Sequence, residues 1–256
     1  MLRSDFFLQI RILLVLVRRD YALQYAGSAL GLTWMFLQNL SLILVYTIVF
    51  YFLGIRSGGG DAREYFAHVL SGLLFWIPLQ EFLIRGTGIL TDNRQLIKRS
   101  PLGPEIFLWI PFVQFLLHWA ITSIPILIFL FWLGKVNILG VLLSFICMVL
   151  TGLYLVCVQN YLARINIILR DISPLVRLLT QFLFWGLPIV YESKGALGKW
   201  NVFNPFFFPL ETFRSALLIG YESRAGFVEF LPFVFLFAGI LLLSRSKLNQ
   251  IVLDHL

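Results

Sequence analysis

The chain has 256 residues, of which 59% are hydrophobic and 13% are charged, and its mean hydropathy is +0.88. Because soluble domains carry roughly 25% charged residues, this composition excludes a water-soluble globular protein. The formal net charge is +7, but the basic residues lie in short segments beside apolar stretches, which favours contact with anionic lipid over nucleic acid. The sequence therefore predicts one membrane-embedded domain that comprises residues 1–256.

The first segment, residues 1–28, combines a short apolar run with arginines. The run Ile12–Val17 is too short to cross a hydrocarbon core of roughly 30 Å, and Arg18, Arg19 and Asp20 follow it. These charges stand where a cleavable signal peptide would have its small-residue site. We therefore expect an amphipathic helix that lies in the inner headgroup layer, with the N-terminus in the cytoplasm.

Six apolar segments have the length of about 20 residues that a transmembrane helix needs. They comprise residues 30–53, 65–90, 106–133, 138–158, 172–191 and 227–243. The short turn Gly134–Asn137 makes the third and fourth spans an antiparallel pair. The predicted fold class is therefore an all-α membrane protein with six transmembrane helices per chain and an N-terminal interfacial helix.

The distribution of Lys and Arg between the loops predicts the orientation. With the N-terminus inside, the inner segments contain more Lys and Arg than the outer segments. Cytoplasmic loops carry such an excess. We therefore expect a multi-pass protein of the bacterial inner membrane with both termini in the cytoplasm.

The region between the last two spans, residues 193–226, is polar at its ends but strongly apolar in its centre. Asn204–Pro209 contains two prolines and three phenylalanines, and the apolar run Leu210–Ile219 follows. Non-helical backbone at membrane depth is tolerated only against protein or a water-filled path. We expect short re-entrant helices in the outer leaflet, and the alternative is an amphipathic surface loop.

Sequence motifs for catalysis and nucleotide binding are missing from the chain. It contains neither a Gly-x-x-x-x-Gly-Lys-Ser/Thr phosphate loop nor a His-Glu-x-x-His motif. Cys147 and Cys157 fall in one predicted span about 15 Å apart, too far for a disulfide within that helix. We therefore predict a conduit or receptor that has no catalytic residues, metal or cofactor of its own.

Two polar pairs lie within predicted spans at helical i,i+4 spacing. Glu81 and Arg85 share one face of the second span, either as a functional site or as a self-neutralising pair. Gln114 and His118 share a face of the third span. Their spacing favours hydrogen bonds between helices over a proton relay.

A series of short motifs follows in order along nearly the whole chain. The first are Arg18-Arg19-Asp20-Tyr21, Ala29–Trp34 and Gln38-Asn39-Leu40. The next are Gly72–Trp76, Asn93–Arg99 and Pro104. The last are Arg170-Asp171-Ile172, Pro188–Tyr191, Asn204-Pro205 and Arg214. In this order and spacing, the chain resembles the permeases of polysaccharide ABC exporters, a type-2 ABC permease family that moves O-antigen, teichoic acid and capsule chains. Ser100–Pro104 departs from that pattern, since the family usually has a shorter link to a single proline.

The resemblance implies a homodimer with its channel between the two copies, assembled with two copies of a separate ATPase that binds ATP and Mg²⁺. The substrate would be a polysaccharide, first of all O-antigen, carried on undecaprenyl pyrophosphate from the cytoplasm to the periplasm. Two alternatives remain open. One is an ABC export permease for a drug or small lipid, and the other is a structural or receptor-type membrane protein without transport.

Three groups of candidate residues follow from the resemblance. A short cytoplasmic coupling helix in the region 92–104 would contact the ATPase through Asn93, Arg94, Gln95, Leu96, Ile97, Lys98 and Arg99. The residues that would admit the anionic lipid head are Arg11, Arg18 and Arg19. The residues that would form the outer gate are Asn204, Pro205, Phe208 and Arg214.

Aromatic and amide side chains follow one face of two predicted spans. On the first span these residues are Trp34, Gln38 and Ser41, and on the fifth span they are Leu178, Gln181, Phe182 and Trp185. Flat aromatic faces and hydrogen-bonding groups suit a hydrated, mostly uncharged glycan that must slide. We expect these faces to meet across the dimer axis and line the substrate path, and the alternative is packing against neighbouring helices.

Overall fold

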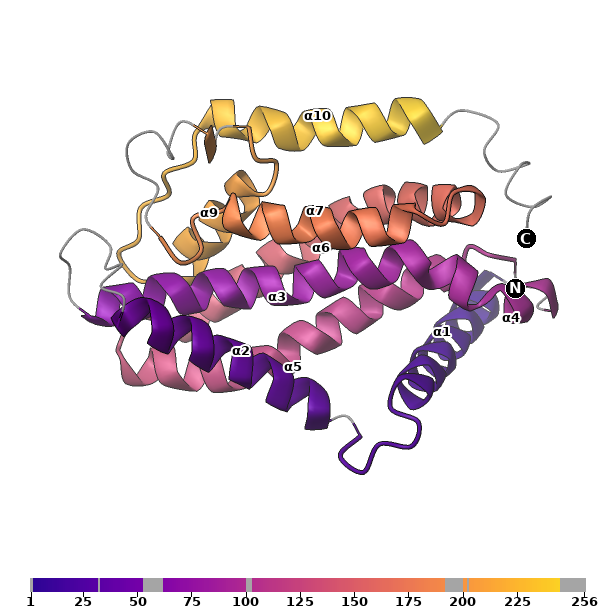
Figure 1. Ribbon diagram of the computed structural model, residues 1–256, viewed down its shortest axis with the longest axis horizontal. Coiled ribbons are helices and arrows are strands. Elements are labelled where there is room, and N and C mark those ends of the chain that lie inside the picture. Colours follow the sequence, from indigo (N-terminus) through magenta and orange to yellow (C-terminus); the bar gives the residue numbers. More distant parts are fainter. Residues whose placement is uncertain are drawn as a thin grey trace.

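The computed structural model of the chain describes residues 2–31, 33–52, 62–99, 103–191, 200–201 and 203–244. Within these residues every regular element is a helix, apart from an isolated bridge between Val136 and Leu218. The all-α prediction is therefore confirmed. In Figure 1 α3, α7 and α10 lie roughly along the long axis of the molecule and α2 and α5 are inclined to them, with α2 on one side of the bundle and α10 on the other.

The N-terminal helix α1 comprises Leu2–Gln24. It ends in a turn where Gly27 and Gly31 have φ values of 78° and 52°, which a residue without a Cβ adopts at little steric cost. The turn leads to α2, Thr33–Phe52. In Figure 1 α1 lies at the end of the bundle where α4 lies, inclined to the long helices. Its predicted position in the headgroup layer stays a prediction.

Helix α3, Ala62–Asp92, is the centre of the structure. Most of its side chains are buried, because α2, α5, α6, α7 and α9 all pack against it. Pro78 lies within it, and the helix continues without interruption on both sides. After Asn93 the chain forms the short helix α4, Arg94–Arg99, at the place predicted for a coupling helix.

The predicted antiparallel pair is confirmed. The short helix η1, Phe107–Trp109, leads into α5, Ile110–Trp132. Asn137 then caps α6, Ile138–Ile168, because its side chain accepts the Gly140 N–H at 2.6 Å. Helix α6 continues well beyond residue 158, since the buried side chains of its last turns still pack on α3.

Helix α7, Ile172–Trp185, ends earlier than the predicted span 172–191. Pro188 explains this difference, because a proline lacks an N–H and disfavours helical backbone in the residue before it. The following segment, Leu187–Val190, is buried without forming a helix. The last two elements are α9, Phe207–Leu217, and α10, Phe227–Ser244.

Three helices within the described residues are long and apolar enough to cross a bilayer. They are Ala62–Asp92, Phe107–Trp132 and Ile138–Ile168. Helix α7 is a shorter apolar helix, so six spans remain a prediction, as do the re-entrant helices. The end of the first predicted span, the beginning of the outer region and the C-terminal tail lie outside the described residues.

The α3–α6 contact depends on a glycine. A Cβ added at Gly86 would lie 2.1 Å from Cγ of Gln159, and Gln159 is fully buried and donates to the Gly86 carbonyl at 3.2 Å. We expect Gly86→Ala to destabilise the purified protein by roughly 1–3 kcal/mol, seen as a lower melting temperature in detergent. Gly226→Ala is the control, since its added Cβ would meet only the flexible end of Glu229. Equal melting temperatures for the two variants would contradict this packing.

Candidate functional site

The predicted ATPase-coupling residues lie at the junction of α3 and α4, residues 92–99, which we call the α3–α4 corner. Their side chains divide between a buried face and an exposed face. Ile97 is 6% exposed and packs in a cluster with residues of α1, α3 and α5. Leu96 is half-buried against the same cluster. The exposed face consists of Arg94, Gln95, Lys98 and Arg99. A partner that docks on α4 therefore meets a polar, basic face.

The α3–α4 corner is attached to α1. The guanidinium of Arg19 donates to Oδ1 of Asn93 at 2.9 Å, and the Asn93 amide donates to the Ile89 carbonyl at 3.1 Å. Asn93 itself is buried. Arg11 and Arg18 are exposed on α1. Of the three arginines predicted to admit a lipid head, Arg19 thus also positions the corner.

A charged network, which we call the inner polar network, comprises Asp20, Glu81, Arg85 and Gln114. Arg85 Nε donates to Glu81 at 2.6 Å, and its NH1 donates to Asp20 at 3.3 Å and to Gln114 at 3.2 Å. The Gln114 amide in turn donates to Asp20 at 2.6 Å. The predicted pairing of Glu81 with Arg85 is confirmed. The network joins α1, α3 and α5, and its members Glu81, Arg85 and Gln114 line a cavity of about 70 Å³.

The His118 side chain belongs to a different set of hydrogen bonds from that of Gln114. The Asn39 amide donates to His118 Nε2 and, at 3.1 Å, to the Thr122 hydroxyl, so α2 is attached to α5. All three side chains are buried. The preference for hydrogen bonds between helices at Gln114 and His118 is therefore confirmed.

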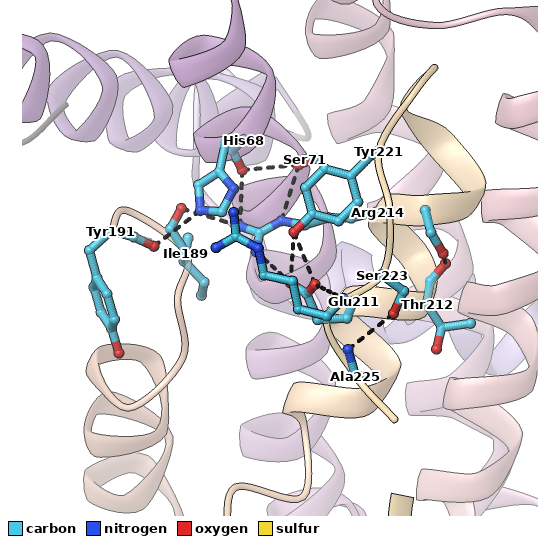
Figure 2. A network of polar contacts seen from close by, with 12 residues as sticks. His68, Ser71, Ile189, Tyr191, Glu211, Thr212, Arg214, Tyr221, Ser223 and Ala225 are labelled. Carbon is cyan, nitrogen blue, oxygen red and sulfur yellow. Dashed lines mark hydrogen bonds and ion pairs between the residues drawn. The ribbon is translucent and has the colours of Figure 1, made fainter. Parts of the chain in front are cut away.

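At the opposite end of α3, Arg214 of α9 is completely buried. Its guanidinium donates to the His68 carbonyl at 3.0 Å, to the Ile189 carbonyl at 3.4 Å and to the Ser71 hydroxyl at 3.4 Å. Figure 2 shows this side chain between α3 and the segment that follows α7. Arg214 thus joins three parts of the chain at one point.

The charge of Arg214 is balanced by Glu211, one helical turn earlier. NH1 of Arg214 lies 3.2 Å from Glu211 Oε1, and the Tyr221 hydroxyl donates to the same carboxylate at 3.0 Å. The backbone N–H of Arg224 donates to its other oxygen at 3.0 Å. Burial raises the pKa of Tyr221 to about 12, so its hydroxyl keeps the proton that it donates. We call Arg214, Glu211, Tyr221, Ser71 and His68 the outer polar network.

The other predicted gate residues come just before α9 and from its first turn. Asn204 is buried, and its side chain accepts the Phe206 N–H at 3.0 Å. Pro205 is half-buried. The ring of Phe208 packs on Phe230 of α10 at a centroid distance of 4.8 Å. Gating by these residues stays a prediction.

A polar cavity of about 480 Å³ opens beside the outer polar network. Its lining includes His68, Tyr221 and Arg224, together with the ion pair between Lys135 and Glu64, whose Nζ and Oε1 are 3.7 Å apart. The Ile219 N–H donates to the Lys135 carbonyl at 2.9 Å, which attaches the chain after α9 to the turn between α5 and α6.

The predicted path residues lie on the surface of the single chain. Every one of them is exposed: Trp34, Gln38 and Ser41 on α2, and Leu178, Gln181, Phe182 and Trp185 on α7. The Ser41 hydroxyl donates to the Gln38 carbonyl at 2.8 Å. The exposed parts of both faces are therefore accessible to a second copy or to substrate, although the Trp185 ring also packs on Phe184.

Two charged residues of these networks were not singled out from the sequence. Glu211 lies within the run Leu210–Ile219, and its i,i+3 spacing from Arg214 is a local signal for an ion pair. Asp20 was assigned only to the basic N-terminal segment, and nothing local predicts its contact with Gln114. Within the described residues, no three His, Cys, Asp or Glu side chains gather as metal ligands would.

The described residues thus define a helical membrane protein with three long apolar helices and a charged network near each end of its central helix. No protein-family model matches the chain. It is 24% identical over 245 residues to the "O-antigen export system permease protein RfbA" of Myxococcus xanthus, covering 93% of this chain and 91% of that protein. It is also 24% identical over 219 residues to the protein of the same name from Klebsiella pneumoniae, covering 82% and 81%. These relatives confirm the resemblance to polysaccharide ABC exporter permeases.

The outer polar network predicts a non-additive pair of substitutions. Arg214→Leu leaves the Glu211 carboxylate buried without its cation, and breaking such a pair destabilises a protein by about 3–5 kcal/mol. We expect the double variant Glu211→Leu/Arg214→Leu to melt at a higher temperature than Arg214→Leu alone. Arg99→Leu, which removes an exposed arginine, is the control and should melt like the unchanged protein. A double variant whose loss of stability relative to the unchanged protein equals the sum of the losses measured for Glu211→Leu and Arg214→Leu alone would contradict the pairing.

Proposed function

We propose that the chain is the permease subunit of an ATP-driven exporter of lipid-linked polysaccharide, with O-antigen as the substrate. Two copies form the channel, and a separate ATPase, also in two copies, binds ATP and Mg²⁺ and supplies the energy. The cargo moves on its undecaprenyl-pyrophosphate carrier from the cytoplasm to the periplasm across the bacterial inner membrane. The two similar proteins support this proposal, because each is named an O-antigen export permease and this chain matches most of its length.

The single observation that carries the proposal is the α3–α4 corner. The central spanning helix passes through Asn93 directly into a short helix with an exposed basic face. Arg19 and the cluster around Ile97 fix this corner to α1 and the rest of the bundle. A force applied to α4 by an ATPase would therefore act on α3 without an intervening loop.

The substrate path and the gate complete the proposal. The exposed aromatic and amide faces of α2 and α7 line the channel where two copies meet. Helix α9 and the segment from Asn204 close its outer end. Arg11 and Arg18, exposed on α1, attract the anionic head of the carrier lipid at the inner surface.

Charge reversal on the exposed face of α4 tests the coupling. We expect Lys98→Glu/Arg99→Glu to lower polysaccharide export by about tenfold or more, because the reversed charges repel a complementary surface on the ATPase. The unfolding temperature of the permease should not change, since both side chains are exposed. Export is measured as surface polysaccharide, and ATP hydrolysis is measured in the purified complex.

Arg63→Glu is the matched control, because it reverses an exposed charge on the first turn of α3, at the helix end away from α4. Export should continue in this control. Normal export in the Lys98→Glu/Arg99→Glu variant would contradict docking on α4. Leu96 and Ile97 are unsuitable for this test because Ile97 is buried within the chain itself.

Thiol accessibility tests the substrate path. In a background with Cys147→Ala and Cys157→Ala, we expect Gln38→Cys and Gln181→Cys to react with a hydrophilic maleimide only when ATP opens the channel. A bulky adduct at either position should stop export. Ile128→Cys, an exposed position on the apolar helix α5, is the control. It gives the reactivity expected of a cysteine that faces lipid and not the channel. Cysteines at 38 and 181 that react no faster than the control under every nucleotide condition would contradict the path.

A further inference from the structure

A second large cavity lies at the end of the bundle where α3 meets the junction of α6 and α7. Its volume is about 580 Å³. Its lining comes from the last turns of α3, from α4, from the end of α6 and from the beginning of α7, and it includes Thr91, Asp92, Asn166 and Ser173. None of the arginines predicted to admit a lipid head lines it.

Asn166 holds the walls of this cavity together. It is 3% exposed, and its amide donates to the Thr91 hydroxyl at 3.4 Å. Its carbonyl oxygen accepts the backbone N–H of Ser173 at 3.0 Å. One buried side chain therefore connects α6 to α3 and to the first turn of α7, so the cavity is built from fixed elements.

Four arginines line the cavity, against a single carboxylate. They are Arg85, Arg94, Arg170 and Arg177, and the carboxylate belongs to Asp92. Arg85 is already neutralised by Glu81 and Asp20. Within the described part of the chain, Arg170 and Arg177 form no ion pair. The cavity therefore keeps an excess of positive charge, to which the N-terminus of α7 adds a partial charge of the same sign.

This arrangement suits a phosphate ester. A guanidinium presents planar N–H donors that bind phosphate oxygens in pairs, and the Ser173 hydroxyl adds a neutral hydrogen-bonding group beside them. A carboxylate ligand has only two oxygens, whereas several arginines on different elements can bind more than two. A diphosphate offers oxygens on two phosphorus atoms, which matches donors that come from α4, from the α6–α7 junction and from α7.

We propose that this cavity, the inner arginine cavity, binds the diphosphate head of a lipid-linked substrate through Arg170 and Arg177. The cavity lies at the end of α3 that continues into α4, so a head group bound there is anchored beside the helix that would contact the ATPase. The lipid-linked source rests on the proposed function. The recognition of a diphosphate by these arginines rests on the cavity itself.

The test uses the full chain in phosphatidylcholine nanodiscs, with farnesyl diphosphate and inorganic pyrophosphate as probes. We expect Arg170→Gln/Arg177→Gln to weaken binding of farnesyl diphosphate by at least about tenfold, as the loss of charge-assisted hydrogen bonds implies. Arg63→Gln/Arg224→Gln, which removes the same charge elsewhere, should bind like the unchanged chain. Arg170→Lys/Arg177→Lys keeps the charge and should recover only part of the affinity. Equal elution volumes in size exclusion show that all the variants are folded.

Undiminished binding in Arg170→Gln/Arg177→Gln, or an equal loss in the Arg63→Gln/Arg224→Gln control, would overturn the site. Displacement of farnesyl diphosphate by excess pyrophosphate supports recognition of the diphosphate itself. Pyrophosphate that binds as tightly as farnesyl diphosphate would overturn the lipid source in favour of a free anion. The binding assay contains neither the ATPase nor a glycan, so its result does not depend on export. If the chain binds farnesyl diphosphate through these arginines but exports no polysaccharide in cells, only the proposed function is refuted.

Discussion

The hydrocarbon core of a bilayer offers no hydrogen-bonding partner, and this constraint decides where the polar side chains of the bundle lie. Arg214 is the clearest example of this constraint. Its fully buried guanidinium contacts a carboxylate, a hydroxyl and two backbone carbonyls. Arg85 is likewise surrounded by two carboxylates and an amide. In both places a charge that would oppose insertion becomes a connection between helices.

Both charged networks are attached to the same helix. With 31 residues, α3 is about 46 Å long, and it carries Ser71 and His68 of one network and Arg85 of the other. The inner arginine cavity also borders on Arg85. Helices at the periphery, such as α2, contact few neighbours and leave wide apolar faces exposed. The rigid centre and the exposed periphery fit a protein whose outer faces meet other molecules.

Hydropathy predicted the long helices well, because the length of an apolar run is a local property that directly limits what can cross a membrane. The pairing of Glu81 with Arg85 followed from spacing on one helix. Other features depend on contacts between distant segments, and local patterns do not encode them. Asp20 reaches Gln114 only after α1 has folded against α5, and the burial of Ile97 depends on the same packing. The early end of α7 had a local signal in Pro188, which the apolar character of the following residues concealed.

The sequence distance between the partners in the outer polar network bears on how the protein is made. Ser71 and Arg214 are 143 residues apart. A ribosome that adds roughly 5–20 residues per second needs on the order of 7–30 s to synthesise that stretch. During this interval α3, α5 and α6 are already available to the membrane, but the carbonyl and hydroxyl groups that Arg214 later satisfies have no guanidinium to bind. The inner polar network, whose members lie within the first 114 residues, can therefore form well before the outer polar network.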